Sequence, residues 1–189
     1  MAPRWHRVRT APRLPAAELN VRRATAQDAE PFASVIAAVA AEERWIGTEP
    51  PVDIAEFAER VRAQLERDDV LWVLELDGRA VGALGLHATR TEGVMSIGMC
   101  IVEEARGRGG GRLFMETVMA HALASPLHKV ELEVWPDNAR AIALYKAHGF
   151  EIEGERRQHY RRRDGTLRSS LIMARLLERE RQSRPGAGT

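Results

Sequence analysis

The stretch EEARGRGGGR, residues 103–112, places four glycines and three arginines in the seven positions from 106 to 112. An apolar segment, VMSIGMCIV (94–102), precedes it, and an amphipathic segment, LFMETVMAHAL (113–123), follows it. The stretch is therefore expected to join a buried strand to a helix. A helix N-terminus carries unpaired N–H groups and partial positive charge, and glycines let the backbone approach a ligand closely. The pattern favours an anion site over a flexible, solubilising connection.

Two common phosphate-binding fingerprints do not fit this stretch. With Gly107 and Gly109 as the first two glycines of a dinucleotide-binding motif, the third glycine would fall at Arg112. No glycine here is followed by lysine and then serine or threonine, as a P-loop requires.

The rest of the chain predicts an α/β fold, in the sense of an α+β mixed sheet with helices on both faces. Turn signals stand at Asp77-Gly78 and at RRDG (162–165), while Asp137 or Asn138 could cap a helix that ends at Gly149. The expected order is β-α-α-β-β-β-α-β-α-β-β. The strands are expected at 19–25, 70–77, 79–90, 94–102, 129–135, 150–157 and 167–176, and the helices at 26–44, 54–67, 112–124 and 138–148.

Length and composition indicate one domain. The 189 residues are divided into a flexible N-terminal extension (1–17), a domain (18–177) and a polar tail (178–189). A net charge of +1 gives no general reason to expect nucleic acid as a partner, and no apolar run is long enough to cross a membrane. The single cysteine, Cys100, fits a reducing, cytoplasmic setting.

Three segments together resemble the GNAT superfamily of N-acetyltransferases. RGRGGG (106–111) is similar to the Arg/Gln-x-x-Gly-x-Gly/Ala loop that holds the coenzyme A pyrophosphate in that superfamily. LEVWPDNARAIALYKAHGFEIEGE (132–155) and LIMARLL (171–177) resemble its following segments. The resemblance covers about 19–177 and is closest to small bacterial members that act on amino acids and related small amines. It implies a GNAT-like fold and direct transfer of an acetyl group from acetyl-CoA to the primary amine of a small molecule.

The resemblance also implies residue roles. The main chain of the strand before the loop would pair with the pantetheine arm, and a bulge there would direct one N–H at the thioester oxygen. Tyr145 would protonate the leaving thiolate or hydrogen-bond it. The expected cofactor-binding residues are Met99, Cys100, Ile101, Arg106, Gly107, Arg108, Gly109, Gly110, Gly111, Arg112, Asn138 and Tyr145.

The residues themselves support part of this assignment. Asn138, Ala141 and Tyr145 fall on one helix face; Tyr145 could by itself be a core-edge residue, but together with Asn138 and the glycine-rich loop it favours catalysis. Many relatives carry an acidic residue where this chain has Ser96, so the base must come from elsewhere. The candidates are Glu131 and Glu133, or Glu42, Glu43 and Glu49, each of which could also be a solvated carboxylate.

The acceptor side is expected at AEERWIGTEPPVD (41–53), where Glu43, Trp45 and Glu49 would contact the substrate and the glutamates would attract cationic amines. Cys100 is interpreted as a buried small side chain, and the six histidines show no metal-ligand spacing. The basic run RRQHYRRR (156–163) is interpreted as a solvated surface. A protein N-terminal or lysine acetyltransferase, a non-catalytic acyl-CoA-binding module and a homodimer remain open.

Overall fold

The computed structural model describes residues 18–67 and 69–177, and the predicted extension (1–17) and tail (178–189) lie outside this range. Over the described residues the elements follow the predicted order, and the mixed α/β class is confirmed. The strands are β1 (Leu19–Arg23), β2 (Val70–Leu76), β3 (Arg79–Ala88), β4 (Val94–Ile101), β5 (Lys129–Val134), β6 (Glu151–Arg161) and β7 (Leu167–Leu176). The α-helices are α1 (Ala29–Ala40), α2 (Ile54–Glu66), α3 (Gly110–Ala124) and α4 (Ala139–Ala147).

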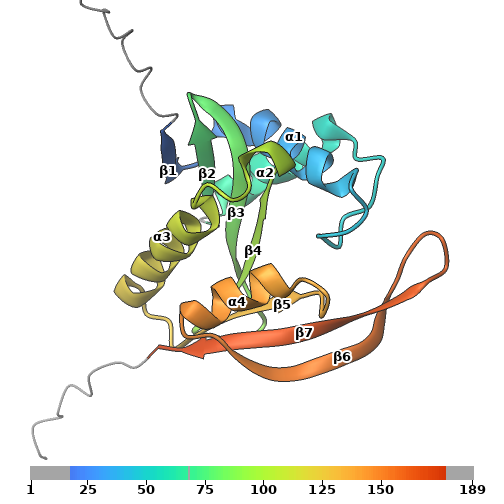
Figure 1. Cartoon of the computed structure of the whole chain (residues 1–189). Coiled ribbons are helices and arrows are strands. Elements are labelled where there is room, and N and C mark those ends of the chain that lie inside the picture. Colours follow the sequence, from blue (N-terminus) through green and yellow to red (C-terminus); the bar gives the residue numbers. More distant parts are fainter. Residues whose placement is uncertain (1–17, 68, 178–189) are drawn as a thin grey trace, which may run out of the picture.

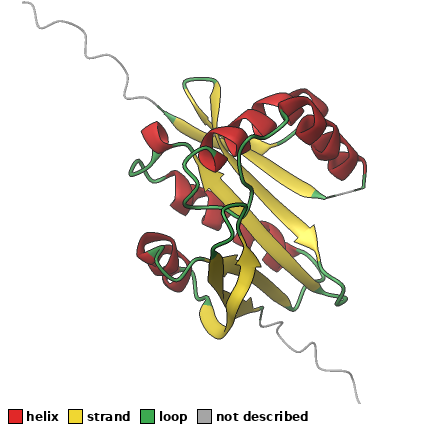
Figure 2. Cartoon of the chain, turned by 90° about the vertical axis from the view of Figure 1, so that its right-hand side faces the viewer, coloured by secondary structure: helices red, strands yellow, loops and turns green. Residues whose placement is uncertain are grey.

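All seven strands form one sheet in the order β1-β2-β3-β4-β5-β7-β6, in which only β4 and β5 run parallel. Helices α1 and α2 cover one face of this sheet, and α3 and α4 cover the other (Figures 1 and 2). The parallel pair follows from α3, because a helical crossover returns the chain to the same end of the sheet.

Two helix boundaries differ from the sequence prediction. The first predicted helix, 26–44, begins as a 3-10 turn at Ala26–Asp28 and ends at Ala40, because the chain turns away through Glu43, which has φ +53°. Helix α3 begins at Gly110, two residues earlier than predicted, behind Gly109 as its N-cap at φ +91°. The glycine-rich loop is therefore shorter than predicted, and two of its glycines belong to the helix.

The predicted turns are confirmed. Asp77 and Gly78 both have positive φ, as the tight turn of the β2–β3 hairpin requires. Asn138 caps α4, where its side-chain oxygen accepts from the Ala141 N–H at 3.1 Å, and Gly149 leaves the helix at φ +81°. Strand β6 extends four residues further than predicted, to Arg161.

The core lies on both faces of the sheet. Leu71 and Leu84 on the central strands, Phe114 and Met115 on α3, and Phe150 after α4 are all fully buried. Each such side chain contributes roughly 2 kcal/mol through burial of its apolar surface. None of the described helices is long and apolar enough to span a membrane.

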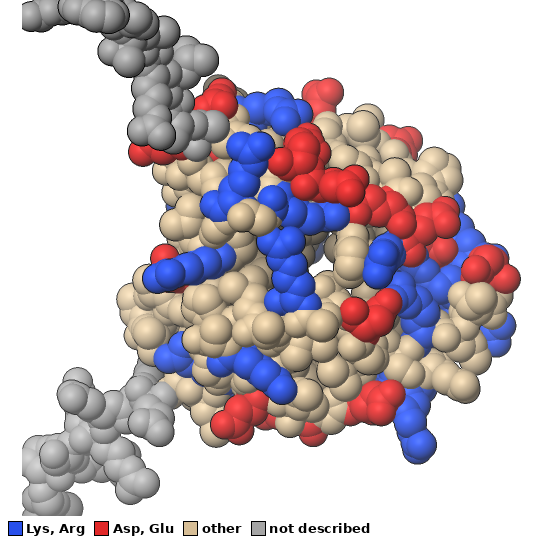
Figure 3. All heavy atoms as spheres, viewed as in Figure 1, with Lys and Arg blue, Asp and Glu red and all other residues tan. Residues whose placement is uncertain are grey.

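The sheet divides at its parallel pair. Strands β4 and β5 pair only from Val94–Ile97 to Lys129–Leu132, and beyond these residues β5 pairs with β7 alone. The second half of β4, from Gly98 to Ile101, therefore has a free edge, and Gly98 is exposed rather than buried as predicted for the whole strand. Figure 3 shows the molecular surface hollowed on this side, with both basic and acidic side chains near the rim of the hollow.

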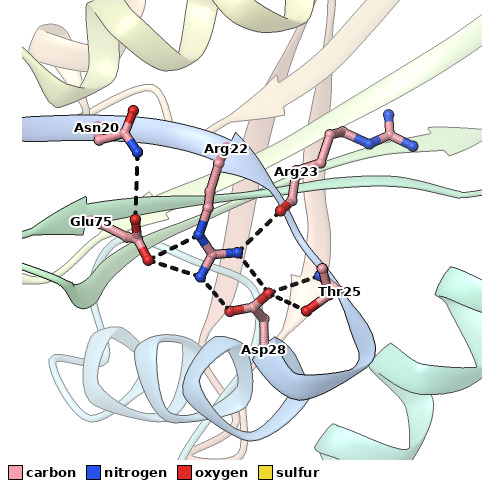
Figure 4. Close-up of polar contacts among 6 residues, drawn as sticks. All are labelled: Asn20, Arg22, Arg23, Thr25, Asp28 and Glu75. Atoms are coloured by element: carbon pink, nitrogen blue, oxygen red, sulfur yellow. Dashed lines mark hydrogen bonds and ion pairs between the residues drawn. The ribbon is translucent and has the colours of Figure 1, made fainter.

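A cluster of polar side chains connects β1 to the 3-10 turn at Ala26–Asp28. Arg22 donates to both oxygens of Asp28 at 2.8 Å and, through Nε, to Glu75 on β2 at 3.0 Å (Figure 4). Asp28 also accepts from the N–H and the hydroxyl of Thr25. The Arg22 guanidinium, together with the Thr25 donors, lowers the pKa of Asp28 to about 2, although burial opposes this shift.

We expect Asp28→Asn to destabilise the protein in a pH-dependent way. Because the folded-state pKa lies below the unfolded value of about 3.9, the carboxylate stabilises the fold above that value, and this contribution is lost as pH falls toward 2. At pH 7 the variant should lose about 1–2 kcal/mol of unfolding free energy. Urea unfolding from pH 7 to pH 3 measures the difference, which should shrink below about pH 4. A difference that is constant with pH would contradict this role.

Candidate active site

The hollow between β4 and β5 contains a cavity of about 590 Å³. Its walls are the second half of β4, the glycine-rich loop, α4, β5, the loop between α1 and α2, and the β6–β7 hairpin. Three of the predicted site residues, Glu43, Glu49 and Arg108, do not line it. The other predicted residues all line the cavity: Trp45, Met99, Cys100, Ile101, Arg106, Gly107, Gly109, Gly110, Gly111, Arg112, Asn138 and Tyr145.

The glycine-rich loop presents unpaired backbone donors to this cavity. In the described part of the chain, no hydrogen bond is donated by the N–H groups of residues 107–112, and the first intrahelical bond of α3 runs from Leu113 to Gly109. Gly107 and Gly109 have φ of +81° and +91°, a conformation that favours glycine. Six successive N–H groups at a helix N-terminus form a site with the right chemistry for a pyrophosphate.

The neighbouring glycines meet different constraints. A Cβ at Gly110 would collide with the side chain of Leu74 on β2, and a Cβ at Gly111 would lie 3.0 Å from Leu144 on α4. Gly110 and Gly111 therefore let α3 pack closely against the sheet and α4. A Cβ at Gly109 would have nothing within 4 Å, so its side of the loop is open to a ligand.

The sequence prediction placed Arg106 on the pyrophosphate, but its side chain is engaged elsewhere. The guanidinium makes a two-pronged ion pair with Glu42, at 2.7 and 2.5 Å, and its Nε donates to the Ile101 carbonyl at 2.8 Å. This ion pair, whose side chains are each 24% exposed, lowers the pKa of Glu42. Glu42 does not line the cavity, which removes it from the candidate bases. Arg106 connects the end of α1, the end of β4 and the loop.

The positive charge near the loop comes from other arginines. Arg108 is exposed and does not line the cavity, while Arg112 lines the cavity and pairs with Glu116 one turn along α3 at 2.7 Å. Arg140 on α4 also lines the cavity, and its guanidinium would be 3.6 Å from a Cβ at Gly107. The sequence prediction missed Arg140, which stands two residues after Asn138 and would have been expected next to the loop once α4 was placed there.

We expect Glu42→Gln and Arg106→Gln to have similar and non-additive effects. If Arg106 positions the loop through Glu42, each variant should weaken coenzyme A binding by a similar, small factor of about threefold. The double variant should then bind coenzyme A as tightly as either single variant. Titration calorimetry on the four proteins measures this cycle. A phosphate-binding Arg106 would give the opposite pattern, with a loss of tenfold or more for Arg106→Gln alone and none for Glu42→Gln.

Strand β4 supplies the middle of the cavity. The predicted bulge is absent, because β4 pairs with β3 in continuous register from Met95 to Ile101. The backbone groups that could meet a ligand instead lie on the free edge left by β5. Burial raises the pKa of the Cys100 thiol to about 12, so it is protonated at neutral pH and is no thiolate nucleophile.

Tyr145 reaches the cavity from α4. Tyr145 is 7% exposed, and its hydroxyl makes no hydrogen bond to another group in the described part of the chain. Burial raises its pKa, with a smaller effect of the neighbouring Cys100. The phenol therefore stays protonated at neutral pH and can donate a hydrogen bond or a proton into the cavity.

Of the candidate bases, the structure brings Glu133 into the cavity. It accepts hydrogen bonds from the Tyr160 hydroxyl at 2.7 Å and the Ser170 hydroxyl at 2.6 Å, and it pairs with Arg156 at 2.7 Å. Tyr160 and Ser170 were missed by the sequence prediction, because they come from the β6–β7 hairpin and meet Glu133 only through the sheet order. Glu131 does not line the cavity and lies 3.8 Å from Lys129.

The loop between α1 and α2 also lines the cavity, through Trp45, Ile46 and Gly47. The predicted attraction of cations by Glu43 and Glu49 finds no support in the geometry. Glu43 is exposed and does not line the cavity, and the half-buried Glu49 accepts a hydrogen bond from the Arg163 N–H on the β6–β7 hairpin at 2.9 Å. The wall that faces a ligand here is therefore mainly apolar and aromatic.

The profile of the Acetyltransferase (GNAT) family matches residues 35–150, which contain the loop, β5 and α4. The chain belongs to the GNAT family. The resemblance inferred from the three motifs is thereby confirmed. Among the described residues of this GNAT protein, no group of three or more histidine, cysteine or acidic side chains is placed to hold a metal ion.

Named relatives agree with this assignment. The chain is 33% identical over 105 residues to the L-amino acid N-acetyltransferase AaaT of Escherichia coli (strain K12), a match over 53% of this chain and 64% of that protein. It is 39% identical over 54 residues to the mycothiol acetyltransferase of Corynebacterium jeikeium (strain K411), covering 29% of this chain and 16% of that protein. The chain thus spans less than two thirds of either relative.

Among solved structures, the fold is similar to that of a GNAT superfamily phosphinothricin acetyltransferase (Pat) from Sinorhizobium meliloti in complex with AcCoA. The TM-score is 0.77 at 20% sequence identity, over 90% of this chain and 95% of that one. The confirmed GNAT-like fold places the glycine-rich loop, β4 and α4 around one cavity in this chain.

Proposed function

We propose that this protein transfers the acetyl group of acetyl-CoA directly to the primary amine of a small molecule. The unpaired N–H groups of residues 107–112 carry the cofactor assignment, because they offer six donors and a helix N-terminus to a pyrophosphate. Arg112 and Arg140 add positive charge beside them. The names of the relatives, one of which is an L-amino acid N-acetyltransferase, support a small amine as acceptor. The single cysteine supports a reducing, cytoplasmic setting.

Acetyl-CoA supplies an activated acetyl group as a thioester, so that transfer forms an N–C bond, breaks the C–S bond and releases the coenzyme A thiol. The acceptor amine must first lose a proton, since primary amines are protonated at neutral pH. Glu133 accepts this proton, directly or through a water molecule. Tyr145, kept neutral by burial, donates a proton to the departing sulfur from the other wall. The backbone of Gly98–Ile101 orients the thioester along the free edge of β4.

The proposal is tested by a screen of primary amines with acetyl-CoA, in which the released thiol is measured. We expect steady thiol release that depends on both substrates, with an acetylated product of the expected mass. Coenzyme A binding without any amine-dependent release would favour a non-catalytic binding module. Absence of coenzyme A binding would overturn the proposal.

For the base, we expect Glu133→Gln to lower kcat about tenfold, because glutamine keeps the size of the side chain but cannot take a proton, while solvent still can. The loss should be smaller at high pH, where more of the amine is already deprotonated. Glu131→Gln is the matched control, since Glu131 lies on the same strand outside the cavity, and it should leave kcat unchanged. Equal effects of the two substitutions would remove Glu133 from the mechanism.

A further inference from the structure

Three arginines of the β6–β7 hairpin make hydrogen bonds to the loop between α1 and α2, and we call Arg162, Arg163 and Arg168 the arginine clamp. Arg162 donates from Nη1 to the Gly47 carbonyl at 2.9 Å. Arg163 donates from Nη1 to the Pro50 carbonyl at 2.6 Å, and Arg168 donates from Nη1 to the Arg44 carbonyl at 3.0 Å. These contacts join segments more than a hundred residues apart in the sequence.

Arg162 is the central member of the clamp. The sequence predicts it in a solvated turn, yet its side chain is 8% exposed, and its Nε lies 3.7 Å from the Glu49 carboxylate. A buried guanidinium loses hydration, and it is tolerated only where charge and hydrogen bonds replace that hydration. Both are supplied here by the α1–α2 loop, so the hairpin and the loop hold each other in place.

The clamp joins the two segments whose residues line the cavity, the α1–α2 loop and the β6–β7 hairpin. On the α1–α2 loop, Trp45, Ile46 and Gly47 line it. Arg162 binds Gly47 itself, and the other two carbonyls that the clamp binds, those of Arg44 and Pro50, lie on either side of this stretch. On the hairpin, Tyr160 and Ser170 line it, just before Arg162 and just after Arg168. The two walls that would surround an acceptor are therefore fastened to each other along their outer margin.

We propose that the arginine clamp closes the acceptor end of the cavity and restricts the acceptor to small free amines, excluding the N-terminus of a polypeptide. This inference rests on the proposed function and makes its acceptor class specific. A peptide acceptor carries extended backbone behind its amine, and this backbone needs an open groove between the loop and the hairpin. In this protein that path is crossed by arginine–carbonyl hydrogen bonds and by the Glu49 contacts.

The test compares amino-acid amides with eight-residue peptides that begin with the same residues, using acetyl-CoA and the full chain. We expect kcat/KM for the amides to exceed that of the matched peptides at least thirtyfold. Arg163→Ala, which removes an exposed clamp side chain, and Arg162→Ala should each lower this ratio at least fivefold through the peptide KM, with the KM for acetyl-CoA unchanged. Should Arg162→Ala fail to fold, Arg163→Ala alone decides the outcome.

Arg161→Ala is the control, because Arg161 is an exposed arginine of the same hairpin that makes no hydrogen bond or ion pair with the described residues of the loop, and the substitution should leave the ratio unchanged. A wild-type enzyme that acetylates the peptides as well as the amides, or folded clamp variants with the wild-type ratio, would overturn the clamp proposal while leaving the acetyltransferase proposal intact. If other small amines are acetylated in place of the amides, the best of them takes the place of the amides in the ratio, and folded clamp variants that gain no peptide acetylation overturn the clamp proposal. If no amine is acetylated, the proposed function fails, and the clamp proposal fails with it.

Discussion

Tyr145→Phe is expected to lower kcat about a hundredfold while leaving coenzyme A affinity nearly unchanged. The substitution keeps the ring, which packs near Phe150 with ring centroids 6.1 Å apart, and removes only the hydroxyl. A thiolate that leaves without a proton donor is a poorer leaving group, and a positioned general acid contributes typically 10²–10⁴-fold. Steady-state kinetics with the best amine from the screen, together with calorimetry for coenzyme A, measure the two quantities separately.

The pH profile distinguishes a chemical role of Tyr145 from a structural one. Because burial raises its pKa, the phenol should remain protonated throughout the neutral and mildly alkaline range, so the wild-type rate should not fall there through loss of this proton. A Tyr145→Phe enzyme with the wild-type kcat would instead return this side chain to the hydrophobic core. A large fall in melting temperature would likewise show that the hydroxyl matters for folding rather than for transfer.

The cavity lining on the glycine-rich loop, β4 and α4 was predictable from the sequence because its signals are local. The glycine-rich loop lies between a strand and a helix, and Asn138 and Tyr145 share one face of a single helix. Helical and strand periodicity place such residues without any knowledge of distant contacts. For the secondary structure, local patterns failed at boundaries, such as the start of α3, where Gly110 is required by contact with Leu74 on another strand.

The acceptor side depends on contacts between distant segments. Arg106 meets Glu42 across 64 residues, and Arg162 meets Gly47 across 115. No local pattern distinguishes an arginine that binds phosphate from one that pairs with a glutamate of another element. For the same reason Glu133 was one carboxylate among five candidates until the sheet order placed Tyr160 and Ser170 beside it.

These contacts also connect the two halves of the site. Arg106 lies 5.8 Å from the ring centroid of Trp45 and donates a hydrogen bond to the Ile101 carbonyl at the end of β4, so the residue that pairs with Glu42 contacts both the α1–α2 loop and β4. The clamp then fixes the same wall from the other side. Variants on the acceptor wall are therefore expected to alter acceptor kinetics more than cofactor binding, unless they disturb Glu42.

Gly109→Asp is expected to weaken coenzyme A binding by about two orders of magnitude, or about 3 kcal/mol. The residue caps α3 at φ +91°, where any side chain is strained by roughly 1–2 kcal/mol. Nothing lies within 4 Å of a Cβ at this position, so the aspartate would project into the open side of the loop. There it would place a negative charge among the N–H groups that are proposed to receive a pyrophosphate.

Gly78→Asp is the control for Gly109→Asp, because it introduces similar backbone strain but places the negative charge away from the cavity. Gly78 has a similar φ of +77° and open space around its Cβ, but it lies in the β2–β3 turn outside the cavity. Both variants should lose similar stability on urea unfolding, whereas only Gly109→Asp should lose coenzyme A affinity in calorimetry. Gly109→Ala introduces the backbone strain without the negative charge. Its coenzyme A affinity should therefore lie between that of Gly109→Asp and that of the wild type. If folded Gly109→Asp binds coenzyme A as the wild type does, the pyrophosphate cannot lie on these amides, and the cofactor must be held along α4 and β4 instead.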